Sequence, residues 1–185
     1  LFRSFPNAGK STLVSHLTNT HLKIAPYPFT TLQPSLGMIK DGRHDPGILI
    51  ADIPGIIEGA ADNRGLGLEF LRHIQRCKVL LFVIDMSGID QRDPFEDLLI
   101  LRKELSQYND NLLDKPCALL LNKMDTKDAQ DGLQEFLKKL NESDLPEQRI
   151  FTLSALDKTG FSPLKSYLRE AKDQAHEEVF AEEIG

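Results

Sequence analysis

Runs of consecutive apolar residues alternate along the chain with stretches in which apolar residues recur every three or four positions. An uninterrupted apolar run is typical of a strand buried on both faces, whereas the wider spacing is typical of a helix. The predicted strands are Leu36–Ile39, Ile48–Ile53, Val79–Asp85, Ala118–Asn122 and Ile150–Leu153. The predicted helices are Lys10–Thr20, Leu66–Gln75, Pro94–Tyr108, Ala129–Leu140 and Ser162–Ala175.

This alternation predicts an α/β fold with a mostly parallel sheet and helices on both faces. In such sheets, ligands bind beyond the carboxyl ends of the strands. The chain of 185 residues is long enough for one domain with its own core. We expect that domain over residues 1–170, starting at a truncated first strand, and an acidic C-terminal tail over residues 171–185.

Composition is that of a globular protein, with 41% hydrophobic and 27% charged residues. No apolar run approaches the roughly 18 residues of a membrane-spanning helix, so we expect no transmembrane segment. Most of the net charge of -6 comes from the acidic tail, so net charge does not indicate a nucleic-acid-binding protein. Two cysteines predict neither a disulfide framework nor a zinc site. No targeting peptide is visible, and we expect the chain to be an excised domain.

The first motif is a phosphate loop, Gly-x-x-x-x-Gly-Lys-[Ser/Thr], in which Ser4 replaces the first glycine. Backbone N–H groups of such a loop cradle phosphates, Lys10 contacts the β- and γ-phosphates, and the Ser11 hydroxyl binds Mg²⁺. A plain strand-to-helix turn is the alternative for this segment alone. The predicted nucleotide contacts are Ser4, Phe5, Pro6, Asn7, Ala8, Gly9, Lys10, Ser11 and Thr12.

The second motif, Asp52-Ile53-Pro54-Gly55, ends a predicted strand with the Asp-x-x-Gly arrangement of nucleotide switches. Asp52 can hold a magnesium-bound water. Gly55 has no Cβ, so its N–H can approach a γ-phosphate and respond to its presence. A capping aspartate and a turn glycine are the alternative interpretation.

The third motif, Asn122-Lys123-Met124-Asp125, follows a predicted strand and favours guanine. The Asp125 carboxylate can accept from N1–H and N2–H₂ of guanine, a pair of donors that adenine lacks. The stem of Lys123 can cover the base, and Asn122 can tie this loop to the phosphate loop. In a fourth motif, Ser154-Ala155-Leu156, the Ala155 N–H can bind guanine O6.

These motifs, in this order, resemble those of the Obg family of translation-factor-class GTPases, and the resemblance covers nearly the whole chain. It implies a Ras-like P-loop G domain that binds GTP and GDP. The most telling residues lie outside the general GTPase motifs. The segments that carry the resemblance are Phe5–Thr12, Tyr27–Pro34, Ala51–Ala60, Asn63–Gly67 and Phe70–His73.

The resemblance also assigns residues of the first switch. Thr31 is implied to reach Mg²⁺ when a triphosphate is bound, and Phe29, Thr30, Leu32 and Gln33 are implied to flank the nucleotide. We therefore expect Lys10, Thr31 and Gly55 to act in hydrolysis. The expected magnesium ligands are Ser11, Thr31 and Asp52.

Hydrolysis is expected to be slow, because Ile56 stands where Ras-like enzymes have the glutamine that orients water. Three devices remain: a water held by backbone and metal, a group supplied by a partner, or a K⁺ ion bound through Asn7. Ordinary turn chemistry is the alternative role of Asn7.

The resemblance implies an association with a large ribosomal subunit precursor or its rRNA. Arg64, Arg72, Arg76 and Lys78 form a basic group that could contact RNA phosphates, or that is simply a solvated helix face. The segment 95–116 resembles the eukaryotic mitochondrial branch, which predicts a mitochondrial location, with cytoplasm or nucleolus as alternatives. The sequence leaves the oligomeric state open.

The sequence thus predicts a GTP-binding, slowly hydrolysing switch in large ribosomal subunit assembly. The alternative is a scaffold or fragment in which Ser4 impairs nucleotide binding and which binds a ribosomal partner without hydrolysis. A P-loop ATPase is opposed by Asp125.

Overall fold

The sheet is the centre of the fold. A computed structural model of the chain describes residues 2–18, 23–24, 35–40, 45–52, 77–108 and 110–184. Within them the strands follow the order β2-β3-β4-β1-β5-β6-β7. Strands β4, β1, β5, β6 and β7 pair in parallel, whereas β3 is antiparallel to its neighbours β2 and β4. The strands are β1 (Phe2–Ser4), β2 (Lys23–Ile24), β3 (Ser35–Ile39), β4 (Ile48–Asp52), β5 (Leu80–Asp85), β6 (Cys117–Asn122) and β7 (Arg149–Thr152).

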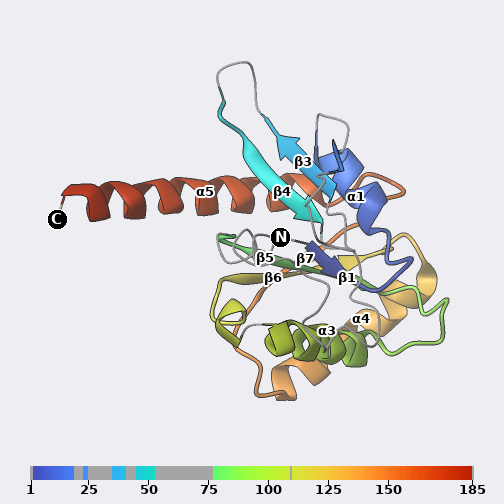
Figure 1. Cartoon of the computed structure of the whole chain (residues 1–185). Helices are drawn as coiled ribbons and strands as arrows, with labels where there is room; N and C mark the ends of the chain where they lie inside the picture. The colour runs from blue at the N-terminus through green and yellow to red at the C-terminus, as the bar shows by residue number, and fades with distance from the viewer. Residues whose placement is uncertain are drawn as a thin grey trace.

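Helices cover both faces of the sheet (Figure 1), which confirms the predicted fold class. Helices α3 and α4 pack on one face, and α1 and α5 pack on the other. None of the helices in the described part of the chain has the length and apolar character needed to cross a bilayer. The helices are α1 (Lys10–Leu17), α3 (Pro94–Tyr108), α4 (Lys127–Glu142), α5 (Phe161–Ile184) and the 3₁₀ helix η1 (Asp110–Leu112).

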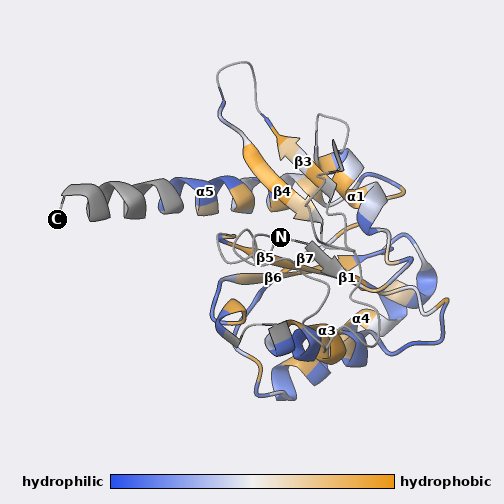
Figure 2. Ribbon diagram, in the orientation of Figure 1, coloured by the Kyte–Doolittle hydropathy of each residue, from blue (hydrophilic) through white to orange (hydrophobic). Residues whose placement is uncertain are grey.

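Strand β5 shows why the apolar runs are uninterrupted. Successive side chains of a strand point to opposite faces of the sheet. Phe82 and Ile84 accordingly belong to the core with α3 and α4, while Leu81 and Val83 belong to the core with α1 and α5. Figure 2 shows apolar residues gathered in the strands and polar residues on the outer helix surfaces.

Helix α4 extends beyond the predicted Ala129–Leu140 at both ends and α5 begins one residue earlier than predicted, whereas two other helix ends differ more from the prediction. Helix α1 ends at Leu17 instead of Thr20, because Thr18 is extended and its hydroxyl donates to the Val14 carbonyl at 2.9 Å. Helix α5 continues to Ile184 instead of ending at Ala175, and projects beyond the sheet (Figure 1). Its last part was predicted as an acidic tail, but it is rich in Glu, which has a high helix propensity. The predicted helix Leu66–Gln75 lies outside the described residues.

We predict that Leu119→Ala lowers the free energy of unfolding by about 2–5 kcal/mol, because Leu119 is fully buried in the core with α3 and α4. The matched control is Leu49→Ala in β4, where the leucine is 61% exposed, and we expect a loss below about 1 kcal/mol. Urea unfolding of both variants measures the difference. Equal losses would contradict the described core.

Candidate functional site

The phosphate loop connects β1 to α1. Asn7 and Gly9 both adopt left-handed backbone conformations, with φ of 62° and 81°. Helix α1 begins directly after Gly9, and the Leu13 N–H donates to the Gly9 carbonyl at 2.9 Å. Gly9 has no side chain to cap the helix, and the first residues of α1 help to line a concave space of about 500 Å³ formed by residues 4–12. The N-terminus of a helix favours an anion.

Ser4, the residue that departs from the motif, ends β1 in an extended conformation. An extended backbone does not require glycine, so a serine in place of the motif's first glycine causes no backbone strain at this position. The side chain is 2% exposed, and its Oγ has no hydrogen-bond partner among the described residues. The consequence of Ser4 is thus a buried polar group without a partner.

Asn122 joins three loops through a side chain that is only 1% exposed. Its Nδ2 donates to the carbonyl of Ala8 in the phosphate loop at 2.7 Å, and its Oδ1 accepts from the N–H of Ala155 at 3.0 Å. A Cβ at Gly9 would lie 2.5 Å from Asn122 Nδ2, so this contact also excludes larger residues at position 9. The predicted tie between the third motif and the phosphate loop is therefore present.

Lys123, in the third motif, is held by Asp85, a residue that was not predicted from the sequence as part of the site. Its Nζ lies 2.6 Å from Asp85 Oδ2, and its backbone has a left-handed φ of 65°. Asp85 ends β5 beside Asn122, and it also accepts from the N–H and hydroxyl of Ser87 at 2.9 and 2.6 Å. The sequence does contain a feature that could have predicted Asp85: it is a carboxylate at the end of an apolar strand, as Asp52 is.

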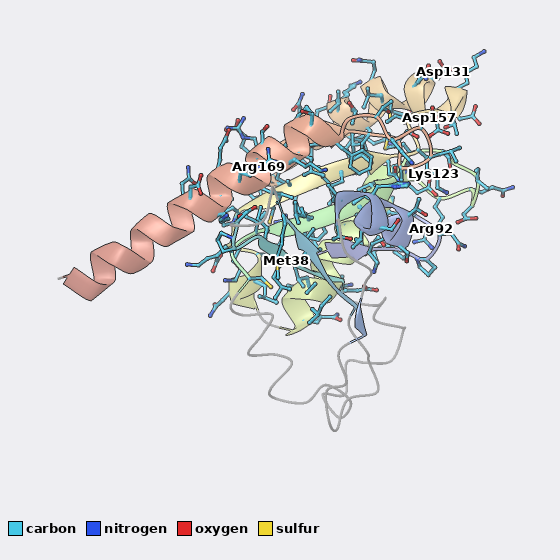
Figure 3. All side chains as sticks on the ribbon, turned by 90° about the horizontal axis from the view of Figure 1, so that it is seen from above. Met38, Arg92, Lys123, Asp131, Asp157 and Arg169 are labelled. Carbon is cyan, nitrogen blue, oxygen red and sulfur yellow. The ribbon has the colours of Figure 1, made fainter. Side chains whose placement is uncertain are left out.

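Asp125 and Ser154 connect the third and fourth motifs. The Ser154 hydroxyl donates to Asp125 Oδ1 at 2.5 Å and accepts from the Asp157 N–H at 3.0 Å. Asp125 itself is exposed, so this hydrogen bond fixes one carboxylate oxygen while the residue remains open to solvent. The Met124 N–H donates to the Leu153 carbonyl at 3.2 Å, and Leu156 is 76% exposed. Figure 3 shows Lys123 and Asp157 at the same end of the molecule, far from Arg169.

The expected magnesium ligands are only partly covered by the structure. Ser11 is exposed in the first turn of α1, next to the phosphate loop. Asp52 ends β4 and is in parallel register with Phe2 of β1, so both strands lead to the same edge of the sheet. An oxygen from each segment suits Mg²⁺, which prefers oxygen ligands. The predicted residues Phe29, Thr30, Thr31, Leu32, Gln33, Ile53, Pro54 and Gly55 lie outside the described residues, as do Arg64, Arg72 and Arg76.

The chain was compared with known families and proteins. The sequence pattern of a family described as 50S ribosome-binding GTPase matches residues 4–123. The chain is 50% identical over 173 residues to GTPase Obg of Protochlamydia amoebophila, covering 94% of this chain and 50% of the relative. It is 48% identical over 166 residues to GTPase Obg of Akkermansia muciniphila, covering 90% of this chain and 46% of the relative. The resemblance to Obg is thus confirmed, and the chain spans about half the length of these relatives.

The fold is also similar to that of a solved structure with a bound nucleotide. The structure of Era in complex with MgGDPNP and nucleotides 1506–1542 of 16S ribosomal RNA matches with a TM-score of 0.63 and 28% sequence identity. The match covers 91% of this chain and 54% of that one. It supports a Ras-like G domain independently of the sequence motifs.

We predict that Asn122→Ala lowers the free energy of unfolding by about 2–4 kcal/mol, because the Ala8 carbonyl and the Ala155 N–H lose their buried partner. Asn141→Ala, an exposed change in α4, is the control and should leave stability within about 0.5 kcal/mol. Urea unfolding without nucleotide measures both, and a loss no larger than the control's would show that the bridge contributes nothing.

Proposed function

The chain belongs to the 50S ribosome-binding GTPase family and carries the GTPase domain of that family, and from this premise we propose that it is a GTP-dependent switch in large ribosomal subunit assembly. The observation that carries the proposal is the Asn122 bridge, which holds the phosphate loop and both base-binding motifs in one arrangement. A site assembled in this way can select one base and read the phosphates attached to it.

Base selection follows from Asp125. Its carboxylate is kept in place by Ser154, and it can accept the two neighbouring donors of guanine. Lys123, held by Asp85, can place its alkyl stem over the base. The Ala155 N–H, which was predicted to donate to guanine O6, donates instead to Asn122 Oδ1 in the structure, so its role is to hold the loops together. Adenine offers no such donor pair, so the arrangement favours guanine nucleotides.

The phosphates would lie in the concave space of residues 4–12, where the N–H groups of the loop and of α1 donate to their oxygens. Lys10 adds a positive charge beside the β- and γ-phosphates. Ser11 and Asp52, with Thr31, would hold Mg²⁺, which neutralises phosphate charge when bound. Gly55 and Thr31 would respond to the γ-phosphate, so that the two switches differ between the GTP and GDP states.

Hydrolysis by this domain is proposed to be slow, because Ile56 offers no polar group to the attacking water. A K⁺ ion beside Asn7 would supply positive charge where other GTPases use an arginine. The left-handed φ of 62° at Asn7 also favours asparagine for purely conformational reasons.

The proposed partner is a large ribosomal subunit precursor or its rRNA, with the basic residues around Arg72 as a candidate contact. The family description and the Obg relatives support this partner. We extend the proposal to a mitochondrial site of action on the resemblance of residues 95–116 alone. The competing function, a nucleotide-impaired scaffold, requires that Ser4 weakens nucleotide binding, and a titration with fluorescent GDP and Mg²⁺ that shows no binding would support it.

We predict that Asp125→Asn weakens GDP binding about tenfold or more and relatively favours xanthosine diphosphate, whose C2 carbonyl accepts from an amide. Titrations of wild type and variant with both fluorescent nucleotides give the ratio of affinities. Asp131→Asn, an exposed change in α4, should leave both affinities unchanged. If the Asp125 variant keeps the wild-type preference, the base site has been assigned to the wrong residue.

A further prediction concerns Asn7. If K⁺ supplies about 2.7 kcal/mol of charge stabilisation, single-turnover hydrolysis should be about a hundredfold faster in K⁺ than in Na⁺. Asn7→Gly should remove this preference yet retain GDP affinity, because glycine adopts a φ of 62° without strain. Equal wild-type rates in the two salts would leave Asn7 with a conformational role only.

A further inference from the structure

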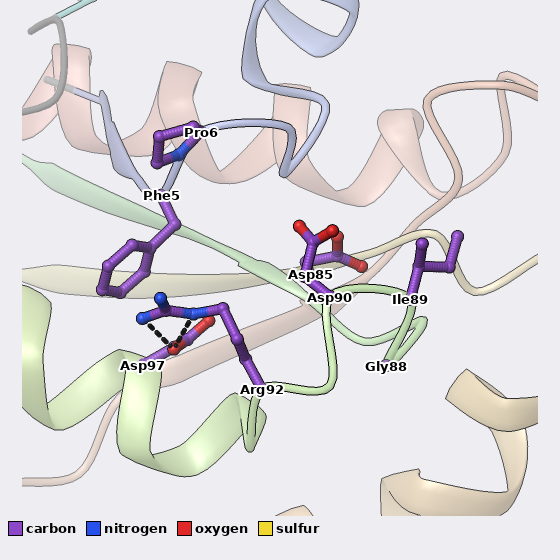
Figure 4. A pocket seen from close by; sticks show the side chains of 8 residues that line it. All are labelled: Phe5, Pro6, Asp85, Gly88, Ile89, Asp90, Arg92 and Asp97. Atoms are coloured by element: carbon purple, nitrogen blue, oxygen red, sulfur yellow. Dashed lines mark hydrogen bonds and ion pairs between the residues drawn. The ribbon is translucent and has the colours of Figure 1, made fainter.

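Arg92, in the loop after β5, stacks on Phe5, the residue that follows β1 in the phosphate loop. The guanidinium carbon of Arg92 lies 3.7 Å from the centre of the Phe5 ring (Figure 4). Such a planar cation over an aromatic face is attractive, and the attraction grows when water is excluded. Phe5 directly follows β1, and its carbonyl accepts from the Ala8 N–H at 3.4 Å. The position of Phe5 is therefore linked to the turn that forms the loop.

Arg92 is itself held in place by a buried carboxylate. Its Nε and Nη2 lie 2.8 and 2.7 Å from Asp97 Oδ1, and these contacts raise the pKa of Arg92. Asp97 is in the first turn of α3 and only 5% exposed. Since Asp97 is part of a helix packed on the sheet, the stacking partner of Phe5 is anchored to the core of the fold.

The residues next to Arg92 are also fixed. The Asp93 carboxylate accepts from the N–H groups of Phe95 and Glu96 at the start of α3, at 2.8 and 3.1 Å. It also pairs with Lys139 of α4 at 2.6 Å, and these contacts lower the pKa of Asp93. Arg92 is thus presented to the phosphate loop from a fixed position.

The space between the two loops is too small for a ligand. The hollow that includes Phe5, Pro6, Arg92 and Asp97 has a volume of about 10 Å³, room for about one water molecule (Figure 4). The contact between the loops is therefore a packing contact, and it connects Arg92 to the phosphate loop through Phe5.

From this geometry we propose that Arg92 is a positioning residue of the phosphate loop, which holds Phe5 so that the loop is in its binding conformation before the nucleotide arrives. The inference rests on the proposed function, because it concerns affinity for the same nucleotide. A loop already in its bound conformation loses less entropy on binding and so binds more tightly. Arg92 should then contribute to GDP affinity beyond its contribution to stability.

The test is the affinity and dissociation rate of fluorescent GDP, measured on the full chain together with urea unfolding in the absence of nucleotide. We expect Arg92→Ala to raise the dissociation constant about tenfold. Lys172→Ala is the matched control, because it also breaks a partly buried ion pair, the 2.7 Å contact with Asp45. It should change the affinity less than twofold while shifting the unfolding midpoint by a similar amount.

A double-mutant cycle separates positioning through Phe5 from a general loss of stability. Phe5→Leu should weaken GDP binding to a similar extent, and the double variant Phe5→Leu with Arg92→Ala should bind no more weakly than either single variant. Should Arg92→Ala not fold, Arg92→Lys keeps the charge but not the planar stack, and we expect about a threefold loss.

The inference would be overturned if Arg92→Ala, or Arg92→Lys where the alanine variant does not fold, bound GDP as tightly as wild type within experimental error. It would also be overturned if the losses of affinity multiplied in the double variant, or if Lys172→Ala lost as much affinity as Arg92→Ala. Failure of the proposed function has a different signature, since wild type would then not bind GDP at all.

Discussion

Position 122 needs a side chain that donates and accepts at the same time, because it faces the Ala8 carbonyl on one side and the Ala155 N–H on the other. An amide meets this requirement, whereas a carboxylate could only accept and an aliphatic residue would leave both backbone groups buried without a partner. The bridge also explains Gly9, since a Cβ there would collide with the amide. The amide at position 122 thus restricts which residues can occupy position 9.

The carboxyl end of β5 provides the second set of constraints. Asp85 holds Lys123 on the base side, and Arg92 stacks on Phe5 on the phosphate side. Both residues belong to one strand and the loop that follows it, so the two halves of the site share a support. A displacement of this loop would change base recognition and the phosphate loop together, which suits a site that must bind a whole nucleotide.

The sequence predicted those parts of the site in which a residue's own chemistry marks the end of a strand, as with Asn122 and its tie to the phosphate loop. The role of Asp52 stays a prediction. The sequence predicted the cores equally well, because β5 and β6 are buried on both faces and therefore continuously apolar. It could not predict the Arg92–Phe5 contact, because that depends on the path of a loop in space. The length of α5 was missed because the acidic segment 171–185 was interpreted as a tail, although its glutamates favour a helix that continues to Ile184.

Strand β1 lies between β4 and β5 and leads into the phosphate loop, in which two residues have left-handed backbone conformations. β5 and β6 are six residues long, pair along their whole length and contribute to both cores. Asn122 ends β6 and donates to the Ala8 carbonyl, and Arg92, in the loop after β5, lies over the Phe5 ring. The phosphate loop is therefore contacted by side chains that come much later in the chain and that are anchored to strands buried on both faces.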